Sequence, residues 1–379
     1  MGLPRYHYTI SLLFCVLALV LMGCGGSELE CRDDLGCLLV RPGEPIRIAL
    51  LLSFSGEVAF LGEDSRGGVE IAIDDRGGEL LEHPLELVAI DAGCSTEQAS
   101  VAAEMIIADA EFVGIIGPNC SDVVKVVMPS VESAGLVMIS PSATAPELTQ
   151  AGSVEPGTGQ GAYFRTAHNN LLQARTVADY AYTVLGARRA AVIYDESTYA
   201  QGLQQQFAEV FQNLGGTVVF RETLGPNPSG IAEKLATIAG NSPDVLYLPV
   251  FEPEGALIVT RLAEVEGLEH MVLMGADSLL VPTFPARGVA AVNGMYLSGP
   301  AVPGTGYEAF LNRWMARYGA APSGLFHAHA YDATTILMDA IETVAQVGNS
   351  GTLLVGRRAL RQAVAATAEF DGLTGTLTC

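Results

Sequence analysis

Basic residues are scarce in this chain. Its 379 residues include 20 lysines and arginines against 42 aspartates and glutamates, which gives a formal net charge of −22. Only Lys125 and Lys234 are lysines. A nucleic-acid partner needs a basic surface to meet its phosphates, so the charge argues against nucleic-acid binding. Strong acidity fits a soluble domain in a salty or acidic exterior but says nothing about fold.

The chain also lacks an apolar run near the ~20 residues that a membrane-spanning helix needs. The run Ile10–Met22, which follows Arg5 and His7, is shorter and is typical of a secretory signal. It ends in Leu21-Met22-Gly23-Cys24, which resembles the lipobox of bacterial lipoproteins. We therefore expect residues 1–23 to be a signal peptide of lipoprotein type and Cys24 to carry the lipid that anchors the protein to the membrane. The alternative is an ordinary signal peptide with a chance cysteine.

The seven cysteines contain no C-x-x-C motif, which disfavours metal or thioredoxin-like chemistry. Cys31 and Cys37 are close together in a polar stretch and could clip a small loop. Cys94 and Cys120 each follow a predicted strand and could bridge the two. In an oxidising exterior this usage indicates disulfides, with Cys379 left over and free buried cysteines as the alternative.

Enzyme signatures are missing as well. The sequence has no G-x-S-x-G elbow, no H-E-x-x-H, no Walker A motif and no G-x-G-x-x-G. His327, His329 and Asp332 could suggest a metal, but positions i and i+2 of a helix point to opposite sides. We therefore expect no catalytic site, no metal and no cofactor.

What the chain does have is a repeated pattern of apolar strand, polar turn and amphipathic helix. The first series has predicted strands at Ile46–Leu52, Leu85–Asp91, Val113–Gly117 and Leu136–Ser140, and helices at Gly67–Asp75, Thr96–Ala108 and Val123–Ala134. The second has helices at Leu171–Leu185, Gln201–Leu214 and Glu254–Glu266, and strands at Ala190–Asp195, Thr217–Glu222, Asp244–Leu248 and Met271–Gly275. Near-continuous apolar strands indicate parallel sheets buried on both faces. Two such series predict an α/β protein of two doubly wound, three-layer (αβα) lobes.

The final part of the chain predicts three helices and no third sheet: Tyr307–Tyr318, Phe326–Val347 and Leu353–Ala366. If these helices return to the first lobe, the chain crosses between lobes more than once and forms a multi-stranded hinge. We expect residues 46–166 and 299–379 to form lobe 1 and residues 167–298 to form lobe 2. Residues 24–45 are predicted to be a tether with the small cysteine clip.

Right-handed crossovers place the loops after the parallel strands on one edge of each sheet. In the first series, the segment Pro118–Asp122 opens a helix whose free amides and Ser121 hydroxyl would bind a carboxylate. Capping of that helix by Ser121 or Asp122 is supported equally. The next loop presents Ser142 and Thr144 at the same edge.

Acidic residues follow strands in the second series. Asp195 and Asp277 each stand just beyond a predicted strand. Either could pair with an ammonium group in the cleft, or could merely cap a helix.

These loops resemble those of the leucine/isoleucine/valine-binding proteins of bacterial ABC importers, which have the type I periplasmic-binding-protein fold. The likeness runs from Ile46 to the C-terminus, and its most specific piece is Gly135-Leu-Val-Met-Ile-Ser-Pro-Ser-Ala-Thr-Ala-Pro-Glu-Leu-Thr149. Further matching pieces are Ser53–Gly56, Asp195–Leu203, Met274–Asp277 and Phe326–Thr334. The Cys94–Cys120 pairing also matches a disulfide of that family.

The resemblance implies a role for each loop residue. Ser121 and the Thr144 amide would hold a ligand carboxylate, and the Thr144 hydroxyl, the Ser142 carbonyl and Asp277 would hold its ammonium. Asp277 stands where the family usually has a longer glutamate. A side-chain pocket would be lined by Leu61, Asn119, Tyr199, Phe251 and Phe326. Leu61 and Phe251 stand where better-known members have tyrosines, and Asn119, at an apolar family position, could admit a polar ligand.

The function that the resemblance implies is capture of an amino acid, branched-chain or a related small amino or amide ligand, between the lobes. The loaded protein, which we expect to be a monomer, would deliver this ligand to an ABC permease from an extracytoplasmic, lipid-anchored position. A stand-alone sensor subunit is the alternative. Family members continue beyond the motif at Gly372–Thr378 with a strand pair in the second lobe, so either this sequence is truncated or that lobe lacks the piece.

Overall fold

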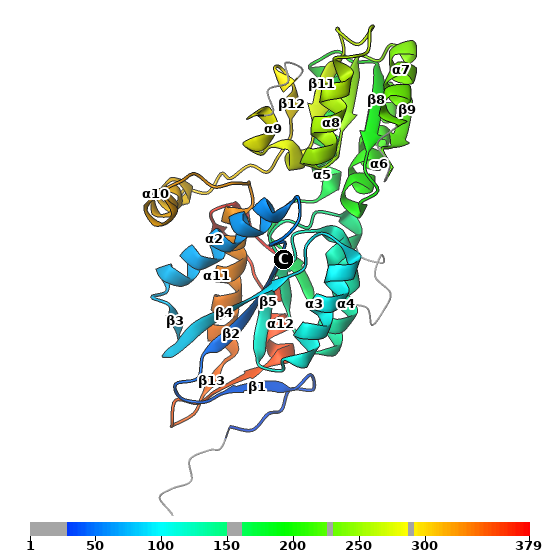
Figure 1. Ribbon diagram of the computed structural model, residues 1–379. Helices are drawn as coiled ribbons and strands as arrows, with labels where there is room; N and C mark the ends of the chain where they lie inside the picture. Colours follow the sequence, from blue (N-terminus) through cyan, green and yellow to red (C-terminus); the bar gives the residue numbers. More distant parts are fainter. Residues whose placement is uncertain (1–28, 150–160, 226–229, 287–291) are drawn as a thin grey trace, which may run out of the picture.

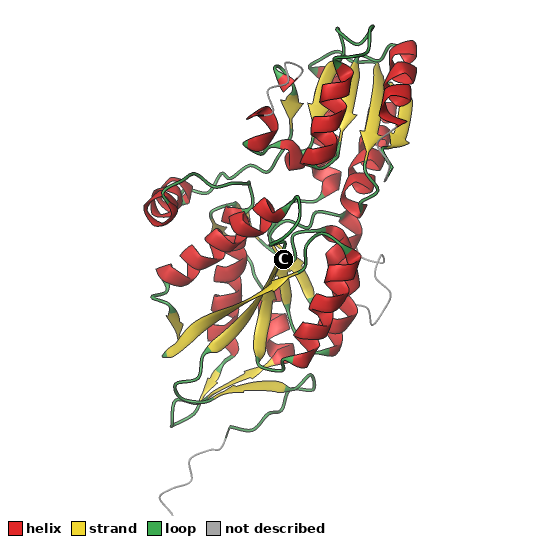
Figure 2. Cartoon of the chain, viewed as in Figure 1, coloured by secondary structure: helices red, strands yellow, loops and turns green. Residues whose placement is uncertain are grey.

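The computed structural model describes residues 29–149, 161–225, 230–286 and 292–379. These residues form two lobes, each with a sheet covered by helices on both faces (Figures 1 and 2). The signal segment and Cys24 lie outside the described residues. No described helix combines the length and apolar character needed to cross a membrane.

Lobe 1 is built on a six-stranded sheet of order β3-β4-β2-β5-β6-β7. All neighbouring pairs in it are parallel except β3 with β4. The strands are β2 (Ile46–Leu52), β3 (Glu79–Leu80), β4 (His83–Asp91), β5 (Phe112–Ile116), β6 (Met138–Ser140) and β7 (Tyr163–Arg165). The four predicted strands of the first series are therefore present, Ile46–Leu52 with the predicted bounds and the other three with shifted ends.

Alternation along β2 divides the core of lobe 1 in two, because successive side chains of a strand point to opposite faces. Ile48 and Leu50 pack with α2 (Ala59–Asp75) and α11 (His327–Val344), whereas Ala49 and Leu51 pack with α3 (Thr96–Ala108) and α4 (Ser121–Ser133). Figure 1 shows these two helix pairs on opposite sides of the sheet. Helix α11 is a predicted C-terminal helix that returns to this lobe.

Lobe 2 has a five-stranded parallel sheet of order β12-β11-β10-β8-β9. Its strands are β8 (Arg189–Tyr194), β9 (Thr217–Thr223), β10 (Val245–Leu248), β11 (Val272–Gly275) and β12 (Tyr296–Leu297). Helices α5 (Asn170–Thr183) and α6 (Thr198–Asn213) cover one face, and α7 (Ile231–Asn241) and α8 (Glu252–Leu262) cover the other. The short helix α9 (Thr283–Ala286) follows β11. Helix α7 and strand β12 were absent from the sequence prediction.

The prediction that the C-terminal region contains no further sheet was wrong. Strand β14 (Leu353–Gly356) pairs with β1 (Cys37–Val40) and with β13 (Gln346–Val347). A hairpin of β15 (Phe370–Gly372) and β16 (Gly375–Leu377) follows. The predicted helix Leu353–Ala366 is thus a strand followed by α12 (Arg357–Ala365), because the apolar Leu-Leu-Val run is buried in a sheet and the helix begins only after Gly356.

The segment expected to be a tether also enters this small sheet. Residues Cys37–Val40 are strand β1, and Leu38 and Val40 join the lobe 1 core. The predicted Cys31–Cys37 disulfide is confirmed, with 5.8 Å between the two Cα atoms. Cys379 is a free, exposed thiol. The clip therefore sits beside a strand of the lobe rather than within a free linker.

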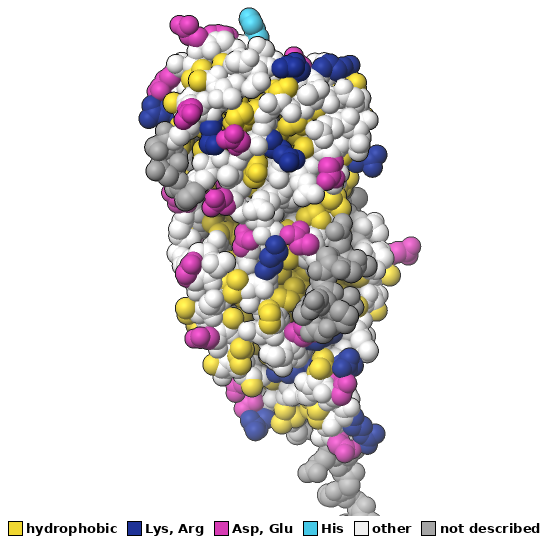
Figure 3. Space-filling view, turned by 90° about the vertical axis from the view of Figure 1, so that its right-hand side faces the viewer, with side chains coloured by type: hydrophobic (Ala, Val, Ile, Leu, Met, Phe, Trp, Pro, Cys, Tyr) yellow, Lys and Arg dark blue, Asp and Glu magenta, His cyan; other side chains and the backbone are white. Residues whose placement is uncertain are grey.

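Within the described residues the chain passes between the lobes at two places (Figure 1). The first crossing, residues 166–169, joins β7 to α5, and the second, residues 298–306, joins β12 to α10 (Tyr307–Tyr318). Helix α10 packs against α2, so the chain returns to lobe 1. Acidic and basic side chains are interspersed over the face shown in Figure 3 rather than gathered in one patch.

Candidate functional site

A pocket between the two lobes brings most of the predicted site residues together. Its lining side chains come from loops at the carboxyl ends of β4, β5, β6, β8, β10 and β11, and from α2 and the start of α11. They are Leu61, Cys94, Asn119, Cys120, Ser121, Asp122, Ser142, Ser197, Tyr199, Phe251, Asp277, Ser278 and Phe326. In each sheet this edge adjoins the point where strand order reverses, between β2 and β5 and between β8 and β10, where α/β sheets bind ligands.

The pocket is narrow in this conformation. Its volume is about 50 Å³, whereas ligand pockets typically measure roughly 300–1,000 Å³. Leu61, Phe326 and Phe251 belong to one apolar cluster that spans both lobes, which accounts for the narrowness. Entry of an amino-acid-sized ligand therefore requires the lobes or these side chains to move apart.

The start of α4 has no side-chain cap. Its N-cap residue is Cys120, which makes no capping hydrogen bond. The Ser121 hydroxyl instead accepts from the Ala145 amide at 3.2 Å. Asp122 accepts from the Thr198 amide at 3.1 Å and from the Thr198 hydroxyl, across the lobe boundary. The capping alternative for Ser121 and Asp122 is therefore wrong, and the positive end of α4 meets the pocket beside a serine hydroxyl.

A disulfide fixes this helix start. Cys120 is bonded to Cys94, which follows β4, and the two Cα atoms are 5.6 Å apart. The Ser53 hydroxyl lies against both sulfur atoms and donates to the Gly93 carbonyl at 2.6 Å. The predicted Cys94–Cys120 disulfide is confirmed, and it ties the loop that carries Ser121 to the loops after β2 and β4.

Asn119 lies in the pocket wall, but its amide is occupied by protein groups. Its Oδ1 accepts from the Ser53 amide at 3.0 Å, and its Nδ2 donates to the hydroxyls of Ser65 and Ser142, each at 3.0 Å. The Ser142 hydroxyl in turn donates to the Asn119 carbonyl at 3.1 Å. Asn119 therefore holds three loops together rather than offering a spare donor or acceptor.

Thr144 does not line the pocket as it stands. Its side chain is 1% exposed, and its hydroxyl has no hydrogen-bond partner among the described residues. Its carbonyl accepts from the Asn170 amide at the start of α5, in the other lobe. A buried hydroxyl without a partner is uncommon in folded proteins and calls for a partner that the protein itself does not supply.

Asp277 is a buried carboxylate held by neutral donors. It is 7% exposed, and its Oδ1 accepts from Gln173 Nε2 and from the Tyr199 hydroxyl, each at 2.7 Å. No ion pair among the described residues includes Asp277, and the N-cap of its short 3-10 helix is Ala276. The capping alternative for Asp277 is therefore wrong. Burial and the charge of Asp277 raise the pKa of Tyr199 well above its usual value, so Tyr199 remains a donor.

Asp195, the other acidic candidate, has a local role. Its carboxylate accepts from the Ser197 amide at 2.8 Å and from the Phe251 amide at 3.3 Å. Burial raises the pKa of Asp195, and the nearby Asp122 carboxylate adds to this shift. Asp195 thus shapes the turns before α6 and α8 but caps neither helix, because their N-caps are Ser197 and Phe251. The capping alternative is therefore wrong for Asp195 as well.

Comparison with known proteins identifies the family of this chain. Residues 45–379 match the sequence model of a family described as periplasmic binding protein. The chain belongs to that family.

Relatives of this periplasmic binding protein include a Leu/Ile/Val-binding protein of Rhizobium johnstonii, 27% identical, with 78% of this chain and 79% of the relative aligned. A Leu/Ile/Val-binding protein of Escherichia coli is 28% identical over 62% of each chain. The crystal structure of a leucine-binding protein from Thermotoga maritima has 26% identity and a TM-score of 0.76, covering 88% of this chain and 91% of that one. The resemblance inferred from the loops and the type I fold are confirmed, and the chain is a binding protein rather than an enzyme.

His327, considered above with His329 for a metal, contacts other protein groups in this binding protein. His327 Nδ1 contacts Asp64 Oδ1 at 2.9 Å, and its Nε2 contacts the Tyr307 hydroxyl at 2.7 Å. Asp64 is fully buried and also accepts from the amides of Gly324 and Phe326. Sequence reasoning missed Asp64, which fixes the loop that carries Phe326. Among the described residues no cluster of three or more His, Cys, Asp or Glu forms a metal site.

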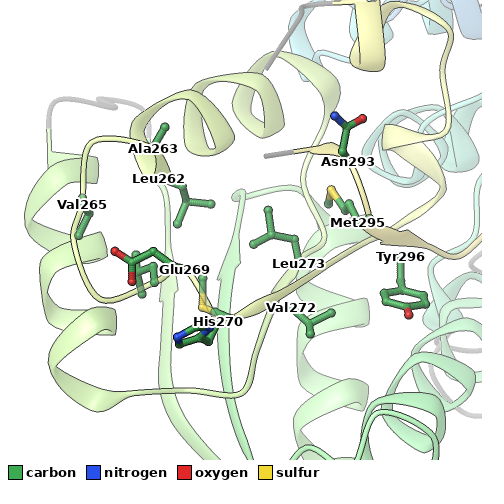
Figure 4. A pocket seen from close by; sticks show the side chains of 13 residues that line it. Leu262, Ala263, Val265, Glu269, His270, Val272, Leu273, Asn293, Met295 and Tyr296 are labelled. Carbon is green, nitrogen blue, oxygen red and sulfur yellow. The ribbon is translucent and has the colours of Figure 1, made fainter. Parts of the chain in front are cut away.

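A larger cavity of about 560 Å³ lies elsewhere in lobe 2. Figure 4 shows Leu262, Leu273 and Val272 around it, with Glu269 and His270 on the loop before β11. This cavity adjoins the amino ends of β11 and β12, the opposite sheet edge from Asp277. Ligands of open α/β sheets bind at the carboxyl ends, so the smaller interlobe pocket remains the candidate site.

Proposed function

We propose that the chain is an extracytoplasmic, lipid-anchored solute-binding protein that captures an amino acid in the interlobe pocket and delivers it to an ABC permease. The observation that carries this proposal is the pairing of opposite chemistries across the pocket. Asp277 in lobe 2 is a buried carboxylate without a cation among the described residues, and the start of α4 in lobe 1 offers a helix N-terminus with a serine hydroxyl. A zwitterion complements both ends.

The ligand carboxylate would bind to the Ser121 hydroxyl and the Thr144 amide. The ammonium would bind to Asp277, the Thr144 hydroxyl and the Ser142 carbonyl. The unsatisfied Thr144 hydroxyl supports this arrangement, because a ligand group would supply its missing partner. Both hydrogen bonds between Asp277 and described side chains end on Oδ1, which leaves Oδ2 for the ligand.

The ligand side chain would contact an apolar wall of Leu61, Phe251 and Phe326, with the ring of Tyr199 beside Phe251 at 5.5 Å between centroids. Asn119 contributes little polarity, since its amide is bonded to Ser53, Ser65 and Ser142. This wall favours a small or medium apolar side chain. The relatives from Rhizobium johnstonii and Escherichia coli, which are named for binding leucine, isoleucine and valine, support the same class.

Binding would shift the protein toward a closed form, because a ligand that touches both lobes binds that form more tightly. Contacts between the lobes already exist beside the pocket. Thr198 at the start of α6 bonds Asp122, and Lys125 of α4 donates to the Thr198 hydroxyl at 3.0 Å. The closed monomer would present both lobes to the permease.

A ligand screen and one isosteric variant test the amine site. Each of the twenty amino acids is added to the wild-type protein, and the ligand that raises the unfolding temperature most is titrated calorimetrically against Asp277→Asn. Loss of a buried charge partner typically costs about 2–5 kcal/mol, roughly 30- to several-thousand-fold in affinity. The exposed Asp371→Asn serves as a control. Wild-type affinity in Asp277→Asn would show that the carboxylate does not hold the ligand.

The anchor is tested separately, because Cys24 lies outside the described residues. Cys24→Ala should move the protein from the membrane fraction to the soluble fraction, since Ile10–Met22 is too short to span. Retention of the variant in membranes washed with high salt would contradict lipid anchoring at this residue.

A further inference from the structure

One polar side chain of the second lobe touches both interlobe crossings and the proposed amine site at once. Gln173, 5% exposed in the first half of α5, donates from Nε2 to Asp277 Oδ1 at 2.7 Å. The same nitrogen lies 3.1 Å from the hydroxyl of Ser298, which begins the second crossing. Its Oε1 lies 2.9 Å from Nε2 of His168, in the first crossing.

The chemistry of the partners fixes the direction of these bonds. The Asp277 carboxylate only accepts, so the Gln173 amide must turn its NH₂ group toward it. Oε1 then faces His168 and can only accept, so His168 Nε2 carries a proton. The other ring nitrogen, His168 Nδ1, is buried without a partner among the described residues. A directed chain of hydrogen bonds thus runs from the first crossing through Gln173 to the pocket.

Gln173 also separates two cavities. Asp277 faces the interlobe pocket, whereas Gln173, His168 and Ser298 line a second cavity of about 490 Å³ between the crossings. Opening or closing of the lobes must turn the backbone of both crossings, because the described chain joins the lobes only there. Any such turn moves His168 and Ser298 relative to α5.

We propose that Gln173 is a positioning residue that orients Asp277 and couples the amine site to the hinge. With Gln173 in place, the carboxylate is held by two donors on Oδ1 and its Oδ2 is set for a ligand amine. A change in the crossings shifts the Gln173 amide and with it the carboxylate. Ligand affinity therefore depends on His168, which does not line the interlobe pocket. This inference rests on the proposed function, since it assigns the ligand amine to Asp277.

The first experiment establishes the contact without any ligand. Gln173→Glu places a second carboxyl against Asp277, and two carboxylates this close cannot both stay ionised. The unfolding temperature of Gln173→Glu should lie below that of wild type at pH 8 and should approach it as the pH falls toward 4.5, when one proton is shared. Adding Asp277→Asn should abolish this pH dependence. Gln212→Glu, the same change at an exposed position of α6, should show none of it.

The second experiment tests the coupling, using as probe the amino acid that shifts wild type most in the screen. Gln173→Leu should weaken binding by roughly 10- to 100-fold, the loss typical of a hydrogen bond to a charged group. His168→Leu should weaken it by about 3- to 10-fold. In the Gln173→Leu background, His168→Leu should have no further effect, because the two residues act through one chain.

Two outcomes overturn the inference: wild-type affinity in Gln173→Leu, or effects of Gln173→Leu and His168→Leu that multiply in the double variant. These results are distinguishable from failure of the proposed function. If Asp277→Asn weakens binding while Gln173→Leu does not, the amine site stands and only the positioning role falls. If Asp277→Asn binds normally, or no amino acid shifts the wild type, the amine assignment falls and the inference falls with it.

Discussion

Acidification should destabilise this protein through one buried histidine. His329, in the first turn of α11, is 3% exposed, and its Nδ1 has no partner among the described residues. Burial lowers the pKa of His329 from 6.5 to about 3, and His168 and His327 nearby add to the shift. The folded protein therefore keeps this ring neutral at a pH where the unfolded chain protonates it.

The sign and size of the effect follow from this difference. Below pH 6.5 His329 binds a proton in the unfolded state but not in the folded state. The free energy of unfolding therefore falls as the pH falls from 6.5 toward 3. One pH unit is worth about 1.4 kcal/mol. At pH 5, about 1.5 units below the unfolded pKa, His329 should cost about 2 kcal/mol relative to pH 7 and above.

His329→Leu removes the titrating ring and replaces it with an apolar side chain. Urea unfolding at pH 7 and pH 5 gives the loss of stability between the two pH values for each protein. Wild type should lose about 2 kcal/mol more than His329→Leu, whereas the exposed His270→Leu should behave like wild type. Carboxyl groups whose pKa burial raises, such as Asp332, act in the opposite direction but are common to all three proteins. An equal loss in wild type and His329→Leu would refute the reasoning.

Three further changes test the supports of the pocket, each by urea unfolding. Asp64→Asn should lower the free energy of unfolding by about 3 kcal/mol or more, because it turns an amide donor toward the backbone amides of Gly324 and Phe326, which need an acceptor. A loss below about 1 kcal/mol would mean that water replaces these bonds. Gly68→Ala should destabilise the protein by several kcal/mol, since the added methyl group would collide with the His327 carbonyl; an alanine tolerated without loss would contradict the close approach of α2 and α11. Replacing Cys94 and Cys120 together with serine should cost about 3.5 kcal/mol, the loop entropy for cysteines 26 residues apart. In reductant, which also opens Cys31–Cys37, wild type and the double variant should have the same stability.

The sequence predicted the pocket well where the geometry of parallel sheets decides it. Ser121, Ser142 and Asp277 each follow a strand, and the carboxyl ends of parallel strands meet at one edge. Excluding helix capping at Ser121 and Asp277 required coordinates. Capping depends on which neighbouring residue is the N-cap, and the structure assigns that position to Cys120 and Ala276.

Elements that depend on pairing between distant segments of the chain were predicted poorly from the sequence. Leu353–Gly356 has apolar residues that suit a helix or a strand, and only its partner Cys37–Val40, more than 300 residues earlier, makes it a strand. Asp64 was missed for a related reason, since its partners at Gly324–His327 lie about 260 residues away. The sequence did contain an indication that Gln173 has a specific role. It is a polar residue on the face of α5 that buries Ala174, Val177 and Ala181. A polar residue on such a face needs a partner inside the protein.

If Asp277 holds the ligand amine as proposed, its buried carboxylate determines how the site selects its ligand. Gln173 and Tyr199 replace part of the hydration that the buried carboxylate loses, so the empty site is tolerable without a cation. If a ligand without an amine bound, the lobes would close around it and Asp277 Oδ2 would be buried without a hydrogen-bond partner. Leaving such a group unpaired is more costly than losing one methylene contact in an apolar wall, which is worth only about 1–3 kcal/mol. The site should therefore discriminate sharply between an amino acid and its deaminated analogue, and only weakly between side chains that differ by one carbon.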